Sequence, residues 1–370
     1  ELKELQVLIK ELKSLLADPE KLKAVIRREL LAIKEKYAAP RRTKVLRSGV
    51  KELSDEDLIP EQENILVLTA GGFIKRTDPA EYRVQRRGGR GVIDLDVKEE
   101  DFVTTFLSAN THSDLLFFSD KGKVYQLKMY ELPEGKRASR GKSILNFLPL
   151  QSEEKITSIL SVPKAAKQKP PSVLMVTRGG VAKKVSLKSF AEVRRNGIIA
   201  LKLGAGDALL SSLLVSPGDE AMIATRLGQS IRFKEGDVRQ MGRAASGVKA
   251  IKVGRGDQVI GAGVVGSEDK KGYLVAVTEN GYGKMTKLAE YKRQKRGGLG
   301  IKTFKLTAKT GKLIDTKVIA DTERELMAIS QQGQLIRTRL TEIPVLRRQT
   351  QGVRIMKLRS GDRLASLTFL

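Results

Sequence analysis

The sequence predicts an all-β, propeller-like fold of six blades, preceded by a short α-helical segment. Three observations carry this prediction. An apolar run followed by a glycine turn occurs six times between residues 61 and 370. A second glycine follows the first after 19 residues in five copies and after 17 residues in the third. Consecutive second glycines lie 50, 56, 50, 53 and 52 residues apart, a repeat length typical of propeller blades.

Helical periodicity is confined to the start of the chain, where we expect two helices. Apolar residues recur every three or four positions in 2–16 and again in 22–37. Between these stripes, Asp18 can cap a helix and Pro19 suits its first position. Each stripe needs an apolar partner, so we interpret residues 1–38 as the stub of a coiled coil. Because the chain does not begin with Met, we expect a piece of a longer protein.

A change of composition separates the helices from the repeats. Residues 39–60 are predicted to be a linker, because they contain prolines at both ends and a polar, acidic stretch. An insertion-like loop at 164–171 accounts for the one interval of 56 residues. From residue 61 onward we expect a domain of six blades, at approximately 61–110, 111–168, 169–217, 218–267, 268–321 and 322–370.

Within each unit, the pattern predicts the order of the strands. The apolar run is a buried strand, the first glycine makes a turn, and a basic strand returns. After the second glycine, alternating apolar residues predict one further strand, for example at Leu145 and Phe147 or at Leu201 and Leu203.

Basic residues gather in the loop that ends at each second glycine. The first copy, which we call the box, contains no acid and consists of Gln85, Arg86, Arg87, Gly88, Gly89, Arg90 and Gly91. Glycines permit a close approach of the backbone to a ligand, and guanidinium groups match phosphate oxygens. The other candidate contacts are Arg137, Arg140, Lys142, Arg194, Arg195, Arg293, Lys295, Arg296, Arg347 and Arg348. In the fourth copy, Arg243 is expected to contribute little.

The overall charge indicates a polyanionic partner. The chain has 69 Lys and Arg against 43 Asp and Glu, a net charge of +26. Equivalent basic loops around a disc would form a positive rim, which can offset the cost of bending stiff duplex DNA. Roughly a dozen phosphate contacts would give a slope near −10 when log K is plotted against log salt concentration. Aromatic residues make up only 5% of the chain, which argues against RNA binding by base stacking.

Several classes of site are excluded or disfavoured. Cysteine is absent, so disulfides and thiolate metal sites are excluded. A single histidine, His112, cannot build a histidine metal site and is expected to be structural. The stretch 204–207 is too short for a phosphate-binding loop and is interpreted as a turn. No apolar run is long enough for a membrane-spanning helix, and the start shows no signal-peptide pattern.

The box resembles the seven-residue signature of the C-terminal domain of the A subunit of bacterial DNA gyrase, in which lysine usually stands at the position of Arg90. The stretches 56–60, 72–76 and 90–93 are similar to the first blade of that family and its approach. Further similarities are found in 115–118 and 122–125, which look like the second blade, and in 1–43, which looks like the end of the preceding coiled coil.

This resemblance implies a six-bladed β-pinwheel whose blades exchange strands. It implies that the domain binds, bends and chirally wraps duplex DNA, with the box as the required element. The whole enzyme would be a cytoplasmic, nucleoid-associated type II DNA topoisomerase that introduces negative supercoils by ATP-dependent strand passage. Its partner would be the gyrase B subunit in an A2B2 holoenzyme, where ATP and Mg²⁺ are bound elsewhere. The fragment itself is expected to hold no catalytic residue, metal or cofactor.

Two alternatives remain open at this point. Topoisomerase IV has a similar C-terminal domain, but with a degenerate or missing box, so an intact box favours gyrase. Alternatively, a propeller with a basic rim could dock an acidic protein partner. Salt-dependent and sequence-independent binding to duplex DNA would favour the wrapping function over a protein scaffold.

Overall fold

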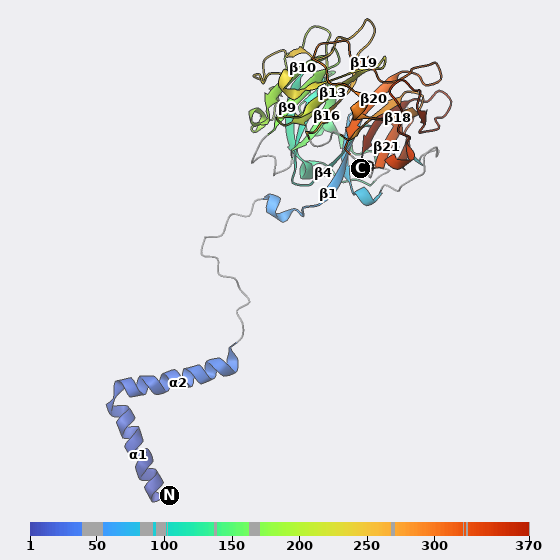
Figure 1. Cartoon of the computed structure of the whole chain (residues 1–370). Coiled ribbons are helices and arrows are strands. Elements are labelled where there is room, and N and C mark those ends of the chain that lie inside the picture. Colours follow the sequence, from blue (N-terminus) through green and yellow to red (C-terminus); the bar gives the residue numbers. More distant parts are fainter. Residues whose placement is uncertain are drawn as a thin grey trace. The chain divides into compact units, whose positions relative to one another are not determined.

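The computed structural model describes residues 1–38, 55–81, 92–93, 101, 103–136, 139–162, 171–267, 271–320, 322 and 325–369 (Figure 1). The box, Arg137 and most of the predicted linker lie outside the described residues. The chain divides into two compact units, Glu1–Asp55 and Glu56–Leu370.

The first unit contains the two predicted helices, α1 (Leu2–Ala17) and α2 (Pro19–Tyr37). Asp18 caps α2, because its Oδ1 accepts hydrogen bonds from the backbone N–H groups of Glu20 at 3.0 Å and Lys21 at 3.4 Å. Pro19 occupies the first helical position, as predicted. No residue of either helix is buried.

The second unit contains six antiparallel sheets of four strands each, which we number blades 1 to 6 in chain order. The middle of each blade is a hairpin whose two strands flank the first glycine of the unit. The first strands of these hairpins are β1 (Glu63–Thr69), β5 (Asp114–Ser119), β9 (Ser172–Thr177), β13 (Glu220–Thr225), β17 (Tyr273–Thr278) and β21 (Glu325–Ser330). The second strands are β2 (Phe73–Thr77), β6 (Lys123–Lys128), β10 (Val181–Ser186), β14 (Gln229–Lys234), β18 (Tyr282–Lys287) and β22 (Gln334–Arg339).

The inner edge of each blade is a strand that follows the hairpin in the same unit. These strands are β4 (Val103–Asn110), β8 (Ile156–Val162), β12 (Leu209–Val215), β16 (Val259–Val265), β20 (Leu313–Ile319) and β24 (Leu364–Phe369). Neighbouring inner strands lie against one another, and β24 lies against β4. All six line one central cavity of about 510 Å³. The inner strands therefore surround the axis of a closed ring.

The outer edge of each blade is a strand of only two residues, contributed by the next unit. In blade 1, for example, Phe73 of β2 pairs with Ser143 of β7. Blade 6 is completed by the first unit, because Gln334 of β22 pairs with Ile93 of β3. The predicted pinwheel with strand exchange is thus confirmed. The outer strands are β3 (Val92–Ile93), β7 (Lys142–Ser143), β11 (Ile198–Ile199), β15 (Val248–Lys249), β19 (Ile301–Lys302) and β23 (Val353–Arg354).

The core lies between adjacent blades. In the hairpin strand β5, every residue is buried, including four consecutive apolar residues from Leu115 to Phe118. Both faces of such a strand are covered because each blade packs between two neighbours. One cluster, for instance, joins Leu174 of blade 3 to Ile223 of blade 4. Continuous apolar runs are therefore the sequence pattern of these strands, as the repeats predicted.

The prediction of a longer strand after the second glycine is wrong. Among the described residues of this stretch, only the two that directly follow the glycine form a strand, as in β7. Leu145 lies in a 3-10 helix, Ile144–Asn146. Leu201 is buried but outside any strand, and its N–H group donates to the carbonyl of Gly122 in the preceding blade at 3.0 Å. The alternating apolar residues thus reflect an extended segment that packs beneath a neighbouring glycine turn. A segment bonded in this way has no partner strand along its length.

Candidate nucleic-acid interface

The basic loops lie at the outer edge of the blades, because each one leads directly into an outer strand. We call them loop 2 (136–141), loop 3 (194–197), loop 4 (243–247), loop 5 (292–300) and loop 6 (347–352), after the unit to which each belongs. Val92 and Ile93, which follow the box in the sequence, form the equivalent outer strand of blade 6. The residues of the box itself lie outside the described part of the chain.

The second glycine of each loop allows the loop to approach the preceding blade. Gly300 has a φ of 75°, and a Cβ atom there would lie 2.4 Å from the carbonyl oxygen of Ser230. Gly352 has a φ of 70°, and a Cβ atom there would lie 2.5 Å from the carbonyl oxygen of Gly283. Both the positive φ and the lack of space require glycine. The recurring glycine of the sequence is therefore the point where each loop joins its neighbour.

Five of the predicted contact residues present their side chains to solvent. None of them forms an ion pair with any residue that the structure describes. They are Lys142, Arg194, Arg195, Lys295 and Arg347. Their charges are available to an external anion.

Two other candidates are partly engaged within the domain. The guanidinium carbon of Arg140 lies 3.7 Å from the centroid of the Phe73 ring, a stacked arrangement that half-buries the side chain. Arg293 Nη1 lies 3.2 Å from Glu220 Oε1, but 54% of the arginine side chain remains exposed. Arg293 can therefore reach a phosphate only in competition with this carboxylate.

The last two candidates connect neighbouring parts of the edge. Arg296 donates from Nε to the carbonyl of Asp237 at 2.8 Å and from Nη1 to that of Lys249 at 3.0 Å. Arg348 likewise donates from Nη1 to the carbonyl of Lys302 at 2.9 Å. Lys249 and Lys302 end the outer strands β15 and β19. These arginines thus bind one loop to the outer strand of the preceding one.

A second series of basic residues was missed by the sequence reasoning. Lys202, Lys252, Lys305 and Lys357 each stand five residues after a second glycine, and all four are exposed. The signal was the glycine register itself, which places the same residue type at the same position in four consecutive units.

These lysines lie beside the next loop along the edge. The backbone N–H group of Lys202 donates to the carbonyl of Ala245 in loop 4 at 3.2 Å. That of Lys252 donates to Gly298 in loop 5 at 2.8 Å. That of Lys305 donates to Thr350 in loop 6 at 3.1 Å. Positive charge is therefore present between the loops as well as in them.

Beneath alternate loops the structure buries a lysine. Lys75, Lys183 and Lys284 occupy the third position after the first glycine in blades 1, 3 and 5, and no more than 1% of each is exposed. Burial lowers the pKa of the Lys183 ammonium to about 8, and the nearby Arg243 acts in the same direction.

Burial of the Lys284 ammonium group lowers the stability of the folded chain. Burial lowers the pKa of its ammonium from 10.5 to about 7, while Glu290 raises it in part and Arg348 lowers it further. Between these two pH values the unfolded chain binds more protons than the folded chain, so the stability of the fold rises with pH across that window. Below about pH 7 the buried charge carries its full cost.

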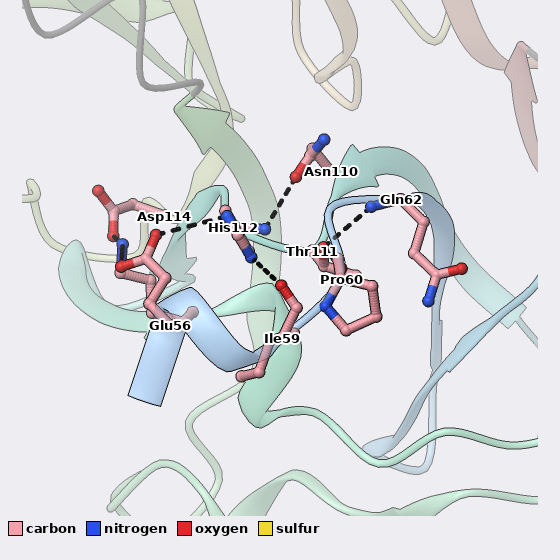
Figure 2. Close-up of polar contacts among 9 residues, drawn as sticks. Glu56, Ile59, Pro60, Gln62, Asn110, Thr111, His112 and Asp114 are labelled. Carbon is pink, nitrogen blue, oxygen red and sulfur yellow. Dashed lines mark hydrogen bonds and ion pairs between the residues drawn. The ribbon is translucent and has the colours of Figure 1, made fainter. Parts of the chain in front are cut away.

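The only histidine of the chain holds the segment that enters the first blade (Figure 2). His112 Nε2 lies 2.8 Å from the carbonyl oxygen of Ile59. Next to it, Thr111 Oγ1 donates to the carbonyl of Pro60 at 2.8 Å and accepts from the N–H group of Gln62 at 3.2 Å. His112 thus has a structural role, as the sequence predicts.

Charged side chains complete this attachment. Lys128 Nζ lies 3.0 Å from Asp114 Oδ1 and 3.5 Å from Glu56 Oε2, and His112 Nδ1 lies 3.9 Å from Glu56 Oε1. Burial alone lowers the pKa of Lys128, but the two carboxylates outweigh it and the pKa is raised. These contacts join the 3-10 helix Asp55–Leu58 to blade 2.

Metal-binding clusters and membrane-spanning helices are both absent from the described part of the chain. It contains no group of three or more His, Cys, Asp or Glu side chains that could hold a metal ion. Among the same residues, no helix is both long and apolar enough to cross a membrane.

Comparisons with known proteins agree with this architecture. The A subunit of DNA gyrase from Staphylococcus epidermidis is 40% identical over 362 residues, which make up 98% of this chain and 40% of that protein. The corresponding protein from Lawsonia intracellularis is 40% identical over 361 residues, which make up 98% of this chain and 44% of that protein. The chain therefore spans less than half the length of these relatives.

Solved structures share the fold. A structure of a DNA gyrase A C-terminal domain has a TM-score of 0.74 at 25% identity and covers 84% of this chain and all of that one. The C-terminal domain of a DNA topoisomerase IV has a TM-score of 0.65 at 22% identity and covers 84% of this chain and 94% of that one, which shows a common fold.

A family of known sequences matches the six units one by one. The family is described as the DNA gyrase C-terminal domain, a β-propeller, and it matches residues 63–110, 113–163, 171–216, 219–266, 272–320 and 324–369. Together with the closed ring, the exchanged outer strands and the relatives above, this match shows that the chain belongs to the DNA gyrase C-terminal domain family.

Proposed function

We propose that this domain binds duplex DNA along its outer edge and wraps it around the ring of blades. The observation that carries the proposal is the placement of the basic loops, each of which enters an outer strand of the closed ring. Exposed arginine and lysine side chains project from these loops, and the exposed lysine series lies between the loops. The net charge of +26 supports a polyanion as the ligand.

The chemistry of the edge suits contacts with phosphates rather than with bases. Duplex DNA has a persistence length of about 150 bp, so curving it around a small domain costs several kcal/mol. Many phosphate contacts spread along an arc offset that cost without any sequence readout. A series of loops and lysines at regular intervals supplies such contacts, and none of the loops needs to recognise a base.

We further propose that the domain acts within the A subunit of a DNA gyrase. There, wrapping would present a neighbouring DNA segment for ATP-dependent strand passage, so that negative supercoils are introduced in the bacterial cytoplasm. The catalytic tyrosine, the contacts with the gyrase B subunit, and the sites for ATP and Mg²⁺ would lie elsewhere in that A2B2 holoenzyme. The intact box (85–91) favours gyrase over topoisomerase IV.

The test is the salt dependence of binding to duplex DNA of about 150 bp. With about two phosphates at each of six loops, the slope of log K against log salt concentration is expected near −10, and random sequences should bind equally well. A shallow slope of about −2 or less would contradict an extended DNA-binding edge and would favour a protein partner.

Removing charge from the box should separate bending from binding. With Arg86 and Arg87 both changed to alanine, the remaining loops still attract DNA, so affinity should fall by about fivefold for each lost phosphate contact, while curvature is lost almost completely. Energy transfer between dyes at the two DNA ends measures the curvature, and filter binding measures the affinity. Arg243→Ala serves as a control and should change both quantities little. An equal loss of bending and binding would contradict a special role for the box.

A further inference from the structure

Buried lysines alternate with uncharged residues around the ring. Lys75, Lys183 and Lys284 stand at one position of the second hairpin strand in blades 1, 3 and 5. In blades 2, 4 and 6 the same position holds a buried residue without positive charge: Tyr125, Ile231 and Ile336. The site is therefore part of the core in every blade, and a long apolar or aromatic side chain fills it adequately. Packing alone does not explain an ammonium group there.

Each ammonium group donates to at least one backbone carbonyl of the basic loop in the next unit. Lys75 Nζ lies 3.0 Å from the carbonyl oxygen of Lys136 and 2.9 Å from that of Ser139, both in loop 2. Lys183 Nζ donates to the carbonyl of Arg243 in loop 4. Two of the residues that supply these carbonyls, Lys136 and Arg243, have exposed basic side chains.

Lys284 makes the most complete set of these contacts. Its Nζ donates to the carbonyls of Arg347, at 2.7 Å, and Arg348, and lies 3.0 Å from Thr350 Oγ1. It also lies 4.9 Å from the centroid of the Phe304 ring. The ammonium group of lysine has three N–H donors, and here each has an oxygen of loop 6.

We propose that Lys75, Lys183 and Lys284 are positioning residues of the DNA-binding edge, which hold loops 2, 4 and 6 with their carbonyls turned toward the blade. The residues whose carbonyls are drawn inward include Lys136, Arg243 and Arg347. The side chains of these three residues are exposed, so their charges can reach a phosphate backbone. The proposal rests on the proposed function and assigns a role to residues that never touch DNA.

The cost of these lysines supports a role other than stabilisation. Burying a charge is unfavourable unless polar groups surround it, and an apolar residue of similar volume often serves the fold equally well. Loop 5 packs over Ile231 and is held at its surface by Arg296. Loop 6 has the corresponding surface contact of Arg348 with Lys302, and Lys284 adds an internal support that loop 5 lacks.

The test compares Lys284→Met with matched changes at the same position in neighbouring blades. Methionine has a similar length and no charge, so the core remains filled. Ile231→Met and Ile336→Met are the controls, since they alter the equivalent core site without removing an ammonium group. Thr350→Val is a milder second variant, which removes the hydroxyl that accepts from Lys284 and donates to the carbonyl of Arg347. It keeps the proposal testable if Lys284→Met does not fold.

Two quantities are measured for each protein. The first is backbone amide exchange without DNA at Leu346 and Arg348, whose N–H groups donate to Met285 O at 2.8 Å and to Glu290 Oε2 at 3.2 Å. The second is the affinity for duplex DNA. In Lys284→Met, exchange at these amides should rise about tenfold or more, exchange in β17 and β18 should stay constant, and affinity should fall about five- to tenfold. Thr350→Val should give smaller changes of the same sign, and the controls should give none.

Two results would overturn the proposal. One is unchanged amide exchange at Leu346 and Arg348 in both Lys284→Met and Thr350→Val. The other is faster exchange in the loop with no loss of DNA affinity, because the lysine would then order the loop for another purpose. If the unaltered domain fails to bind DNA in a salt-dependent way, the proposed function itself fails, and this is seen before any variant is compared.

Discussion

Changing Lys202, Lys252 and Lys305 together to alanine is expected to weaken duplex DNA binding by roughly 100-fold near physiological salt. Each exposed lysine lies beside the next basic loop, where it can neutralise one phosphate. One lost contact reduces the salt slope by about 0.9, which corresponds to about fivefold in affinity at about 0.15 M salt. The three losses should therefore lower the slope by about 3, as measured by fluorescence anisotropy over a range of salt concentrations.

The matched control removes the same charge from another part of the domain. The control residues are Lys121, Lys155 and Lys312. Lys121 lies in the hairpin turn between β5 and β6, and Lys155 and Lys312 directly precede the inner strands β8 and β20. All three are exposed, and none of them belongs to an outer strand, a basic loop or the lysine series between the loops. Changing them together to alanine should reduce affinity less than about threefold. Equal losses from the two triple variants would mean that net charge, and not the outer edge, governs binding.

Gly300→Ala is expected to destabilise the domain by about 3 kcal/mol, because backbone strain and a steric clash add at this position. The φ of 75° alone costs an alanine about 1 kcal/mol. In addition, its Cβ atom would lie 2.4 Å from the carbonyl oxygen of Ser230, so loop 5 would have to move away from β14. Urea denaturation at equilibrium measures the loss.

Two further glycines separate the contributions of φ and space. Gly206 has a φ of 73° but open space around its missing side chain, so Gly206→Ala should cost only about 1 kcal/mol. Gly242 has open space and no positive φ, so Gly242→Ala should change stability by less than about 0.5 kcal/mol. A cost at Gly300 no larger than that at Gly206 would contradict a tight junction between loop and blade.

The architecture could be predicted because individual residues, above all the glycines, mark each repeat in the sequence. Glycines that require positive φ and a close approach keep their spacing, as at Gly300 and Gly352, and their period sets the number of blades. The cap at Asp18 was equally visible, since one side chain decides where α2 begins. Such features depend on local chemistry, which a sequence displays directly.

The inner strands could not be predicted because their burial does not alternate. In β12 and β20, every third residue is buried. Each of these strands pairs with a hairpin strand and also lines the central cavity. A search for period-2 alternation overlooks such strands. The same search wrongly assigned a strand around Leu201, where alternation comes from packing beneath Gly122.

The basic loops could be recognised from the sequence, but it could not be predicted which of their side chains are exposed and which are bonded within the domain. Arg296 and Arg347 look alike in the sequence, yet Arg296 donates to the carbonyl of Lys249 while Arg347 is exposed. The partner of Arg296 lies 47 residues away in the chain and becomes a neighbour only when the blades close. The lysine beneath loop 6, Lys284, is likewise an ordinary basic residue until its burial is known.

The wrapping of DNA in a single sense is tested most directly by a change in linking number. Relaxed circular DNA is incubated with the domain, treated with an enzyme that nicks and reseals it, and analysed by gel electrophoresis. The account predicts a positive shift that grows with protein concentration and disappears when Arg86, Arg87 and Arg90 are changed to alanine. No shift at saturating protein, despite tight and salt-dependent binding, would contradict chiral wrapping by this domain.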